Sequence, residues 1–299
     1  MNIFIWYASV LYKILKYIGM QPKQVEIEKG TTLHFIAPYK RDIKKPNVVL
    51  LHGFAGDGLI TWHFQILSLR KKYNIYVPDF LFFGKSFTST SERSTRFQAD
   101  CVAKGLKKLG VDEKCVVVGF SYGGFVGFEL AEHYPELVGS MIATGSVVGW
   151  SETRNRMTLE RLGFSSLSEL LLPVSVDGAK TLLDVGSYSF PYMPTFIYKH
   201  FLEIMFNNRK ERAELLEALV IRDQDVSTHQ FQQIIHLIWG SEDQLMNVEV
   251  AKSLKERLGG KGKLQVVEMA GHLVLQERPF MFNKYLKDML SSLAIENPY

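Results

Sequence analysis

The sequence has few of the residues and motifs that bind metals, cofactors or nucleic acids. Only two of its 299 residues are cysteine, and no histidines and cysteines have the spacing of metal ligands. It has no phosphate-binding P-loop and no glycine motif for dinucleotides. The formal net charge is +4, without the basic stripe that is typical of nucleic-acid binding. We therefore expect no metal, no other cofactor and no nucleic-acid partner.

The two cysteines are too few for a disulfide framework. Cys101 falls on an expected helix and Cys115 on an expected buried strand, so we interpret both as reduced packing residues. Reduced cysteines fit a reducing compartment. We expect an intracellular protein, in the cytoplasm or on the cytoplasmic face of a membrane such as the endoplasmic reticulum.

The N-terminus lacks an apolar run long enough to cross a bilayer. Residues 1–20 are mostly apolar and aromatic, but Lys13 and Lys16 interrupt them, and a spanning helix needs about 20 apolar residues. Two interpretations stay open. The segment is either a helix packed on the body of the protein, or an interfacial helix that contacts a membrane with Trp6 and Tyr7 at headgroup level.

Strand-like apolar runs alternate with segments of helical periodicity through most of the chain. Strands are expected near residues 25–28, 32–37, 47–51, 74–78, 114–119, 139–145, 234–239 and 263–267. Helices are expected near residues 59–71, 93–109, 122–134, 247–258 and 277–293. Several of the strands are apolar throughout, as in a parallel sheet that is covered on both faces. The pattern predicts an α/β fold with a mostly parallel, eight-stranded sheet flanked by helices.

One long interval interrupts this alternation. More than 80 residues separate the strand that ends near Val148 from the strand that starts near Ile234, and they contain no clear strand. A connection of this length in a compact domain must have its own structure. We expect residues 149–228 to form a helical lid after the sixth strand, over an apolar pocket. Residues 21–148 and 229–299 then form the core, and residues 1–20 the N-terminal helix.

Ser121 lies between an apolar strand-like run, residues 115–118, and an amphipathic segment. The order strand, sharp turn, serine, helix is typical of a nucleophile elbow. Gly119 and Gly123 flank the serine, and we expect them where a side chain would collide with the neighbouring strand and helix. A serine hydroxyl is nearly unionised at neutral pH and needs a base to act as a nucleophile.

A base and an acid follow Ser121 in the order that α/β-hydrolases use. Asp243 comes after the apolar run 235–240, and His272 lies in a loop after the run 264–267. We predict that Ser121 is the nucleophile, that His272 is the general base and acid, and that Asp243 orients the imidazole. Asp223 and Asp225 are the rival acids, but they precede the strand that Asp243 follows.

Two backbone amides are candidates for an oxyanion hole. The loop of residues 52–56 follows the expected strand 47–51, which lets the N–H of Phe54 point at a developing oxyanion. The N–H of Tyr122, directly after the nucleophile at a helix N-terminus, is the second donor.

Several stretches resemble the α/β-hydrolase superfamily, and more narrowly a plant group described as lipase-like or epoxide-hydrolase-like. They are HGFAGDG (52–58), PDFLFFGKS (78–86), VGFSYGG (118–124), RLGFSSLSELLLP (161–173), MFNNRKERAELLEAL (205–219) and AGHLVLQERP (270–279). The resemblance implies the triad Ser121, Asp243 and His272 and a helical cap, but no substrate. Because the elbow carries a serine and not a carboxylate, we expect acyl transfer and not epoxide opening.

These observations predict a serine hydrolase that cleaves a small ester with an apolar acyl or alcohol group. Two alternatives stay open: an acyltransferase on the same triad, and a ligand receptor of the same fold with low turnover. Some relatives that are acyltransferases carry His-x4-Asp at the catalytic histidine, where this chain has His272 and Glu277. His52 and Asp57 also fit that spacing, and we interpret Asp57 as a turn or helix-cap residue.

Two further interpretations concern surface properties. We interpret the charged run at residues 209–212 as the solvated start of a helix. The oligomeric state is left open.

Overall fold

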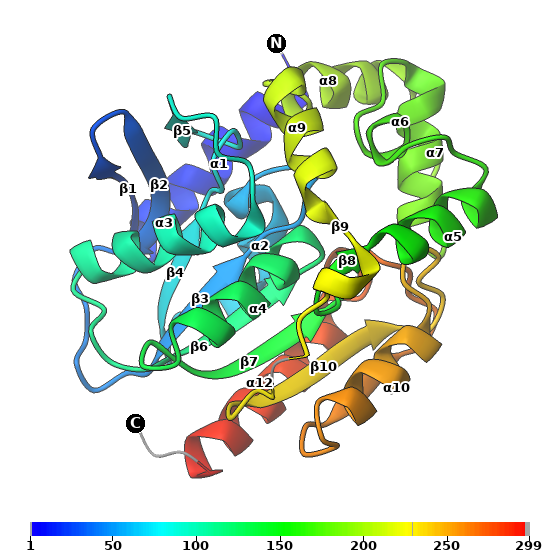
Figure 1. The fold of residues 1–299 in the computed structure, drawn as a ribbon. Coiled ribbons are helices and arrows are strands. Elements are labelled where there is room, and N and C mark those ends of the chain that lie inside the picture. The colour runs from blue at the N-terminus through cyan, green and yellow to red at the C-terminus, as the bar shows by residue number, and fades with distance from the viewer. Residues whose placement is uncertain (1, 229, 297–299) are drawn as a thin grey trace.

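A computed structural model describes residues 2–228 and 230–296, with a mostly parallel sheet at its centre (Figure 1). Residues 1, 229 and 299, at which the expected N-terminal helix and the second core segment begin or end, lie outside the described residues. The strand order is β1-β2-β4-β3-β6-β7-β10-β11, with β5 paired to β2. The strands are β1 (Met20–Glu28), β2 (Thr31–Pro38), β3 (Asn47–Leu51), β4 (Asn74–Pro78), β5 (Phe87–Thr88), β6 (Cys115–Phe120), β7 (Val138–Thr144), β10 (Ile234–Gly240) and β11 (Leu264–Val267).

The pairings explain how the sequence pattern arises. Strands β1, β2 and β5 pair antiparallel, whereas β3, β4, β6, β7, β10 and β11 pair parallel with one another. The predicted α/β fold with a mostly parallel sheet is confirmed. Within the described residues the sheet has nine strands, whereas eight were expected. The strand that was not predicted is β5, because its two residues are too few to produce a sequence pattern.

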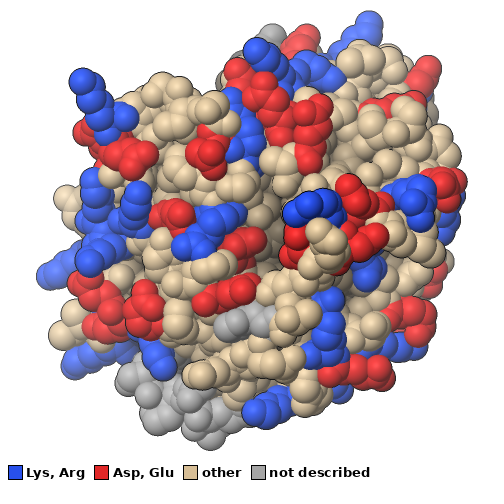
Figure 2. Space-filling model, viewed as in Figure 1, with Lys and Arg blue, Asp and Glu red and all other residues tan. Residues whose placement is uncertain are grey.

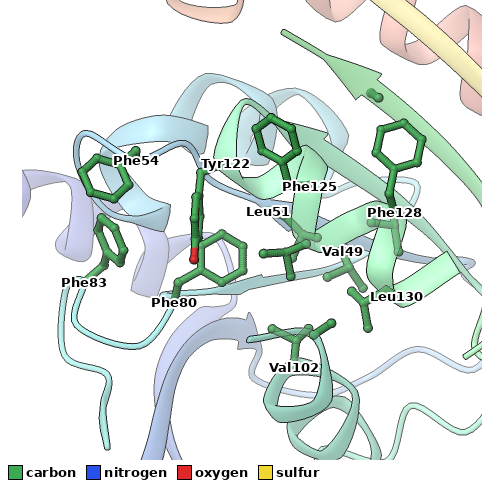
Figure 3. Close-up of a cluster of buried hydrophobic side chains, with 14 of the residues drawn as sticks. Val49, Leu51, Phe54, Phe80, Phe83, Val102, Tyr122, Phe125, Phe128 and Leu130 are labelled. Atoms are coloured by element: carbon green, nitrogen blue, oxygen red, sulfur yellow. The ribbon is translucent and has the colours of Figure 1, made fainter. Parts of the chain in front are cut away.

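Helices cover both faces of the sheet, so the central strands are buried on both sides. Val48 and Leu50 of β3 face one core cluster, and Val49 and Leu51 face the other (Figure 3). The first cluster includes residues of α1 (Ile3–Tyr17), α2 (Gly58–Leu69), α11 (Val274–Glu277) and α12 (Pro279–Glu296). The second includes residues of α3 (Thr95–Lys108), α4 (Tyr122–His133) and α10 (Val248–Arg257). A strand buried on both faces reads as a continuous apolar run.

Short polar side chains begin several of these helices. Asp57 accepts a hydrogen bond from the N–H of Ile60 at 2.8 Å and caps α2. Ser94 caps α3 through the N–H of Phe97, at 3.1 Å. Such caps satisfy amide donors that the first helical turn leaves without a partner. The predicted cap role of Asp57 is confirmed.

Residues 149–228, called the insertion below, leave the sheet after β7 and return before β10. The insertion is mainly helical and lies on the side of the molecule towards which β7 and β10 point (Figure 1). Its elements are β8 (Trp150–Ser151), α5 (Glu152–Leu162), α6 (Leu167–Leu171), α7 (Val176–Gly186), α8 (Thr195–Met205), α9 (Arg209–Leu219), β9 (Val220–Ile221) and the 3₁₀ helix η1 (Asp223–Asp225).

The first and last strands of the insertion pair with each other. β8 and β9 form a separate two-stranded parallel sheet, with Trp150 opposite Val220 and Ser151 opposite Ile221. The interval was expected to lack strands, and this expectation is wrong for these four positions. Two-residue strands show no alternation that a sequence could reveal. Their pairing brings the two ends of the insertion together.

The expectation of a solvated charged run at the start of α9 is wrong for Arg212, which is only 2% exposed. Its guanidinium donates to the carbonyl of Phe82 at 3.0 Å, to the carbonyl of Met205, and to Asn207 Oδ1 at 2.6 Å. It also lies 4.1 Å from the centroid of the Phe83 ring. Burial lowers the pKa of Arg212 to about 10, so the group stays charged at neutral pH. Arg212 therefore ties the insertion to the loop after β4.

Charged side chains of both signs are interspersed on the face of the molecule seen in Figure 2. The described residues on that face gather into no large patch of one sign. This distribution agrees with the small net charge of the chain.

Replacing Arg212 by alanine should lower the free energy of unfolding by about 3 kcal/mol or more, because two carbonyls of buried residues and Asn207 Oδ1 lose their donor and the ring contact is lost. Urea or thermal unfolding measures the change. Lys210→Ala, at an exposed position of the same helix, should change the stability by less than about 0.5 kcal/mol. Equal unfolding midpoints for the two variants would contradict the anchoring role of Arg212.

Candidate active site

Ser121 occupies a strained turn between β6 and α4. Its backbone has φ 52° and ψ −119°, and positive φ values are uncommon for residues other than glycine. The N–H of Ser121 donates to the carbonyl of Thr144 in β7 at 2.9 Å, and the Ser121 carbonyl accepts from the N–H of Gly124 at 2.8 Å. These bonds to a neighbouring strand and to its own helix hold the serine at the tip of the turn.

The glycines beside Ser121 lie where neighbouring backbone leaves no space for a side chain. A Cβ atom added to Gly119 would lie 2.7 Å from the carbonyl oxygen of Gly123, and one added to Gly123 would lie 2.3 Å from the carbonyl oxygen of Leu51. Both distances are shorter than Cβ contacts in real proteins. Strands β3 and β6 and helix α4 therefore approach each other closely around the serine.

Asp243 and His272 form a buried pair at the carboxyl end of the sheet. They are 4% and 5% exposed, and Asp243 Oδ2 lies 2.8 Å from His272 Nδ1. Asp243 Oδ1 accepts from the N–H groups of Leu245 and Met246 at 2.9 and 2.8 Å, which fixes the plane of the carboxylate. Because a carboxylate only accepts, Nδ1 carries the proton and Nε2 is left as an acceptor.

The second ring nitrogen of His272 is available for chemistry. Nε2 is buried and has no hydrogen-bond partner among the described residues, Ser121 included. Hydrogen bonds between a nucleophile and its base are often long before substrate binds. His272 and Ser121 both line the same cavity.

The rival acids lie away from this pair. Asp223 accepts from the N–H and the hydroxyl of Thr153 at 3.2 and 2.6 Å, and so ties η1 to the start of α5. Asp225 pairs with Arg222 at 2.6 Å on the surface. The structure therefore brings only Asp243, of the three candidates, to His272.

The cavity above Ser121 has a volume of about 280 Å³ and a mostly apolar lining. The core contributes Phe54, Tyr122 and Phe125 next to the serine. The insertion contributes aliphatic and aromatic side chains, among them Leu167, Leu182, Phe190, Met193, Phe201 and Leu219. Helix α1 contributes Phe4, whose ring centroid lies 5.8 Å from that of Phe201. An uncharged, apolar group fits such a lining best.

The two predicted oxyanion donors lie on the wall of this cavity. The Phe54 and Tyr122 rings meet edge to face with centroids 5.8 Å apart, and Phe80 and Phe83 pack beside them (Figure 3). Neither backbone N–H has an acceptor among the hydrogen bonds of the described residues. Within the described residues, both amides therefore remain without an acceptor.

His52 fixes the loop that carries Phe54, a role that the sequence analysis missed. The side chain is fully buried; its Nδ1 donates to the carbonyl of Gly53 at 2.7 Å, and its Nε2 accepts from the N–H of Phe80 at 3.0 Å. Burial lowers the pKa of His52 to about 4, so the ring is neutral at physiological pH. The only feature of the sequence that pointed to this role of His52 was its position directly after an expected strand.

The described residues include no group of three or more His, Cys, Asp or Glu side chains that is arranged to hold a metal ion.

Comparison with known sequences points to the α/β-hydrolase fold. A family model described as "alpha/beta hydrolase fold" matches residues 46–162. The chain is 24% identical over 310 residues to epoxide hydrolase 1 of Caenorhabditis elegans, a match that covers 91% of this chain and 71% of the relative. It is 26% identical over 306 residues to monoacylglycerol lipase ABHD6 of Bos taurus, covering 97% and 89%.

Solved structures agree with this placement. A putative lipase from Acinetobacter baumannii AYE has a TM-score of 0.84 at 20% identity, with 97% of each chain covered. A membrane phospholipase A, described as a bacterial virulence factor, has a TM-score of 0.79 at 21% identity, with 96% of this chain and 92% of the other covered. Together with the family model, these likenesses show that the chain has the α/β-hydrolase fold.

Proposed function

We propose that this chain is a serine hydrolase that cleaves a carboxylic ester with an apolar acyl or alcohol group. The observation that carries the proposal is the buried Asp243–His272 pair, at 2.8 Å, in which His272 lines the same apolar cavity as Ser121 and has a second ring nitrogen without a partner among the described residues. A nucleophile, a base with an orienting carboxylate, and two amide donors are the parts that acyl transfer needs.

In the first half of the reaction, Ser121 Oγ attacks the ester carbonyl while His272 Nε2 takes the hydroxyl proton. The carbonyl oxygen becomes an oxyanion and binds the N–H groups of Phe54 and Tyr122. Asp243 stabilises the imidazolium through Nδ1–H. The tetrahedral intermediate then collapses, the bond to the alcohol oxygen breaks, and His272 gives its proton to the leaving alcohol. The acyl group remains on Ser121.

In the second half, water replaces the alcohol. His272 Nε2 takes a proton from the water molecule as its oxygen attacks the acyl-enzyme carbonyl, and the same two amides bind the new oxyanion. Collapse of this intermediate breaks the bond to Ser121 Oγ, which recovers its proton from His272. The products are one carboxylic acid and one alcohol for each ester and water consumed.

The relatives include both lipases and epoxide hydrolases, and the serine at the elbow favours ester cleavage. One relative is named a monoacylglycerol lipase, and one structural neighbour is named a membrane phospholipase A. An epoxide hydrolase is also a relative, but the proposed nucleophile here is the serine at the tip of the turn. A serine hydroxyl suits attack on an acyl carbon, with an oxyanion that the backbone amides bind.

We also propose that the insertion acts as a lid over the cavity. Helices α6 to α9 and the segment between α7 and α8 contribute the apolar side chains that line the cavity on the side away from the sheet. A lid of this composition excludes water from the acyl chain and strengthens the electrostatic interactions at Ser121. Its shape then selects the ester.

We propose a peripheral membrane contact through residues 1–20. In the part of the chain that the structure describes, no helix has the length and apolar character to cross a bilayer. Helix α1 buries Leu11 and Leu15 against the body but leaves Ile5 and Trp6 half exposed, at 53% and 51%. Apolar side chains on an amphipathic helix are suited to the headgroup region.

The neighbouring helices extend this exposed apolar surface. α2 contacts both α1 and α12; it exposes Phe64 and Leu67, and α12 exposes Phe280 at 91%. Phe4 of α1 lines the cavity at the same time, which would bring a membrane lipid near the site. The proposed location is the cytoplasmic face of a membrane, which the two free, buried cysteines support.

The Asp243→Asn variant should lower kcat on a p-nitrophenyl ester by roughly three to four orders of magnitude, because the amide favours the wrong histidine tautomer. Wild type should release many acyl groups per molecule, whereas a low-turnover receptor would release one. The control is Asp225→Asn at the exposed rival acid, which should keep nearly full activity. If Asp243→Asn kept most of its activity, Asp243 would not be the acid of the triad. If wild type released only one acyl group per molecule, the proposed hydrolase function would be contradicted.

The double variant Ile5→Ser, Trp6→Ser should lose binding to phosphatidylcholine vesicles, because each serine removes apolar area from the proposed contact. Vesicle flotation of the full chain measures the bound fraction. Ile43→Ser, at an 83% exposed apolar position in the loop after β2, is the matched control and should bind as wild type does. Wild-type protein that stays in the unfloated fraction would refute the membrane contact.

A further inference from the structure

Glu277 of α11 binds backbone amides from two segments that are far apart in the sequence. Its Oε2 accepts from the N–H of Gly271 at 2.7 Å, directly before His272. Its Oε1 accepts from the N–H groups of Tyr188 and Ser189, at 2.9 and 3.3 Å, in the insertion between α7 and α8. An ionised carboxylate is the side chain best suited to accept three amide donors at once.

The two segments also contact each other directly. The N–H of Leu273 donates to the carbonyl of Gly186 at 2.8 Å. A Cβ atom added to Gly271 would lie 2.6 Å from the carbonyl carbon of Ser187, so only glycine allows this approach. The histidine loop and the insertion therefore pack backbone against backbone on both sides of His272.

The segment that Glu277 holds continues into the wall of the cavity. Phe190 follows Ser189 directly in the sequence and Met193 comes three residues later, and both side chains line the cavity with Ser121 and His272. A displacement of this segment would change the shape of the cavity and would pull on the loop that carries the proposed base. The single carboxylate of Glu277 connects these two effects.

We propose that Glu277 is a positioning residue that fixes His272 and the Phe190–Met193 wall of the cavity relative to each other, and thereby contributes to the selection of acyl chain length. The proposal rests on the hydrolase function proposed above. Glu277 does not exchange a proton with substrate in this account, because both of its oxygens accept from backbone amides. It acts on the reaction through the histidine loop.

The test compares Glu277→Gln with Glu268→Gln, a control at an exposed position of the same loop region. Glutamine keeps one acceptor oxygen but directs an NH₂ group at the other amides, so it releases one of the two segments. With p-nitrophenyl acetate, kcat should fall about tenfold, with KM within about twofold of wild type. With p-nitrophenyl octanoate, whose chain reaches Phe190 and Met193, KM should rise about tenfold as well. Glu268→Gln should match wild type on both esters.

A merely structural defect would give a different result. Loss of correctly folded protein would lower kcat by the same factor for both esters and leave KM unchanged, and this outcome would overturn the proposal. Glu277→Asp should restore part of the octanoate KM, because it keeps the charge on a shorter side chain. Full wild-type kinetics in Glu277→Gln would also overturn it.

Amide hydrogen exchange tests the same contacts without any enzyme activity. In Glu277→Gln, exchange should be faster than in wild type at the amides of the released segment, either Tyr188 and Ser189 or Gly271, and it should be unchanged in Glu268→Gln. If wild type cleaves no ester, the proposed function fails, while faster exchange would still support the link between the two segments. If wild type cleaves esters but exchange in Glu277→Gln is unchanged, the proposed role of Glu277 is rejected while the proposed function stands.

Discussion

The close approach of three backbones around Ser121 is the constraint on which the proposed site depends. Strands β3 and β6 and helix α4 lie so close that a Cβ at Gly123 would be 2.3 Å from Leu51. This packing holds Ser121 at a positive φ of 52°, where the backbone alone would not stay. The surrounding sheet and helix therefore maintain the strained backbone of Ser121, and no large local loop is needed to hold the serine in place. The amide of Tyr122 is fixed by the same turn.

The parallel sheet brings the other parts of the site to one edge. Asp243 and His272 follow β10 and β11, and Phe54 follows β3. All of these strands run in the same direction, so residues 121, 243 and 272 meet although they lie far apart in the chain. The insertion lines the apolar cavity beside them and is tied by the β8–β9 pair, by Arg212 and by Glu277. Each of these three contacts involves backbone N–H or carbonyl groups, which every residue has, so none of them leaves a signal in the sequence.

Much of this arrangement could be predicted because it leaves a periodic or positional signal. Buried strands read as apolar runs, and Ser121, Asp243 and His272 each follow such a run. The strands β5, β8 and β9 could not be predicted, since two residues show no period. The burial of Arg212 was missed because its acceptors are carbonyls of other segments, which every residue has. The sequence did not indicate which aromatic residues of the insertion line the cavity, because that depends on how α6 to α9 pack.

The most direct measurement of the central claim is covalent labelling of the full chain by a fluorophosphonate probe, followed by peptide mass spectrometry. This account predicts rapid loss of fluoride and one phosphonyl adduct on Ser121, because the oxyanion amides and His272 are positioned to activate that hydroxyl. Ser121→Ala should carry no adduct, and His272→Ala should label much more slowly. Folded wild-type protein that remains unlabelled, or an adduct on a residue other than Ser121, would contradict the account.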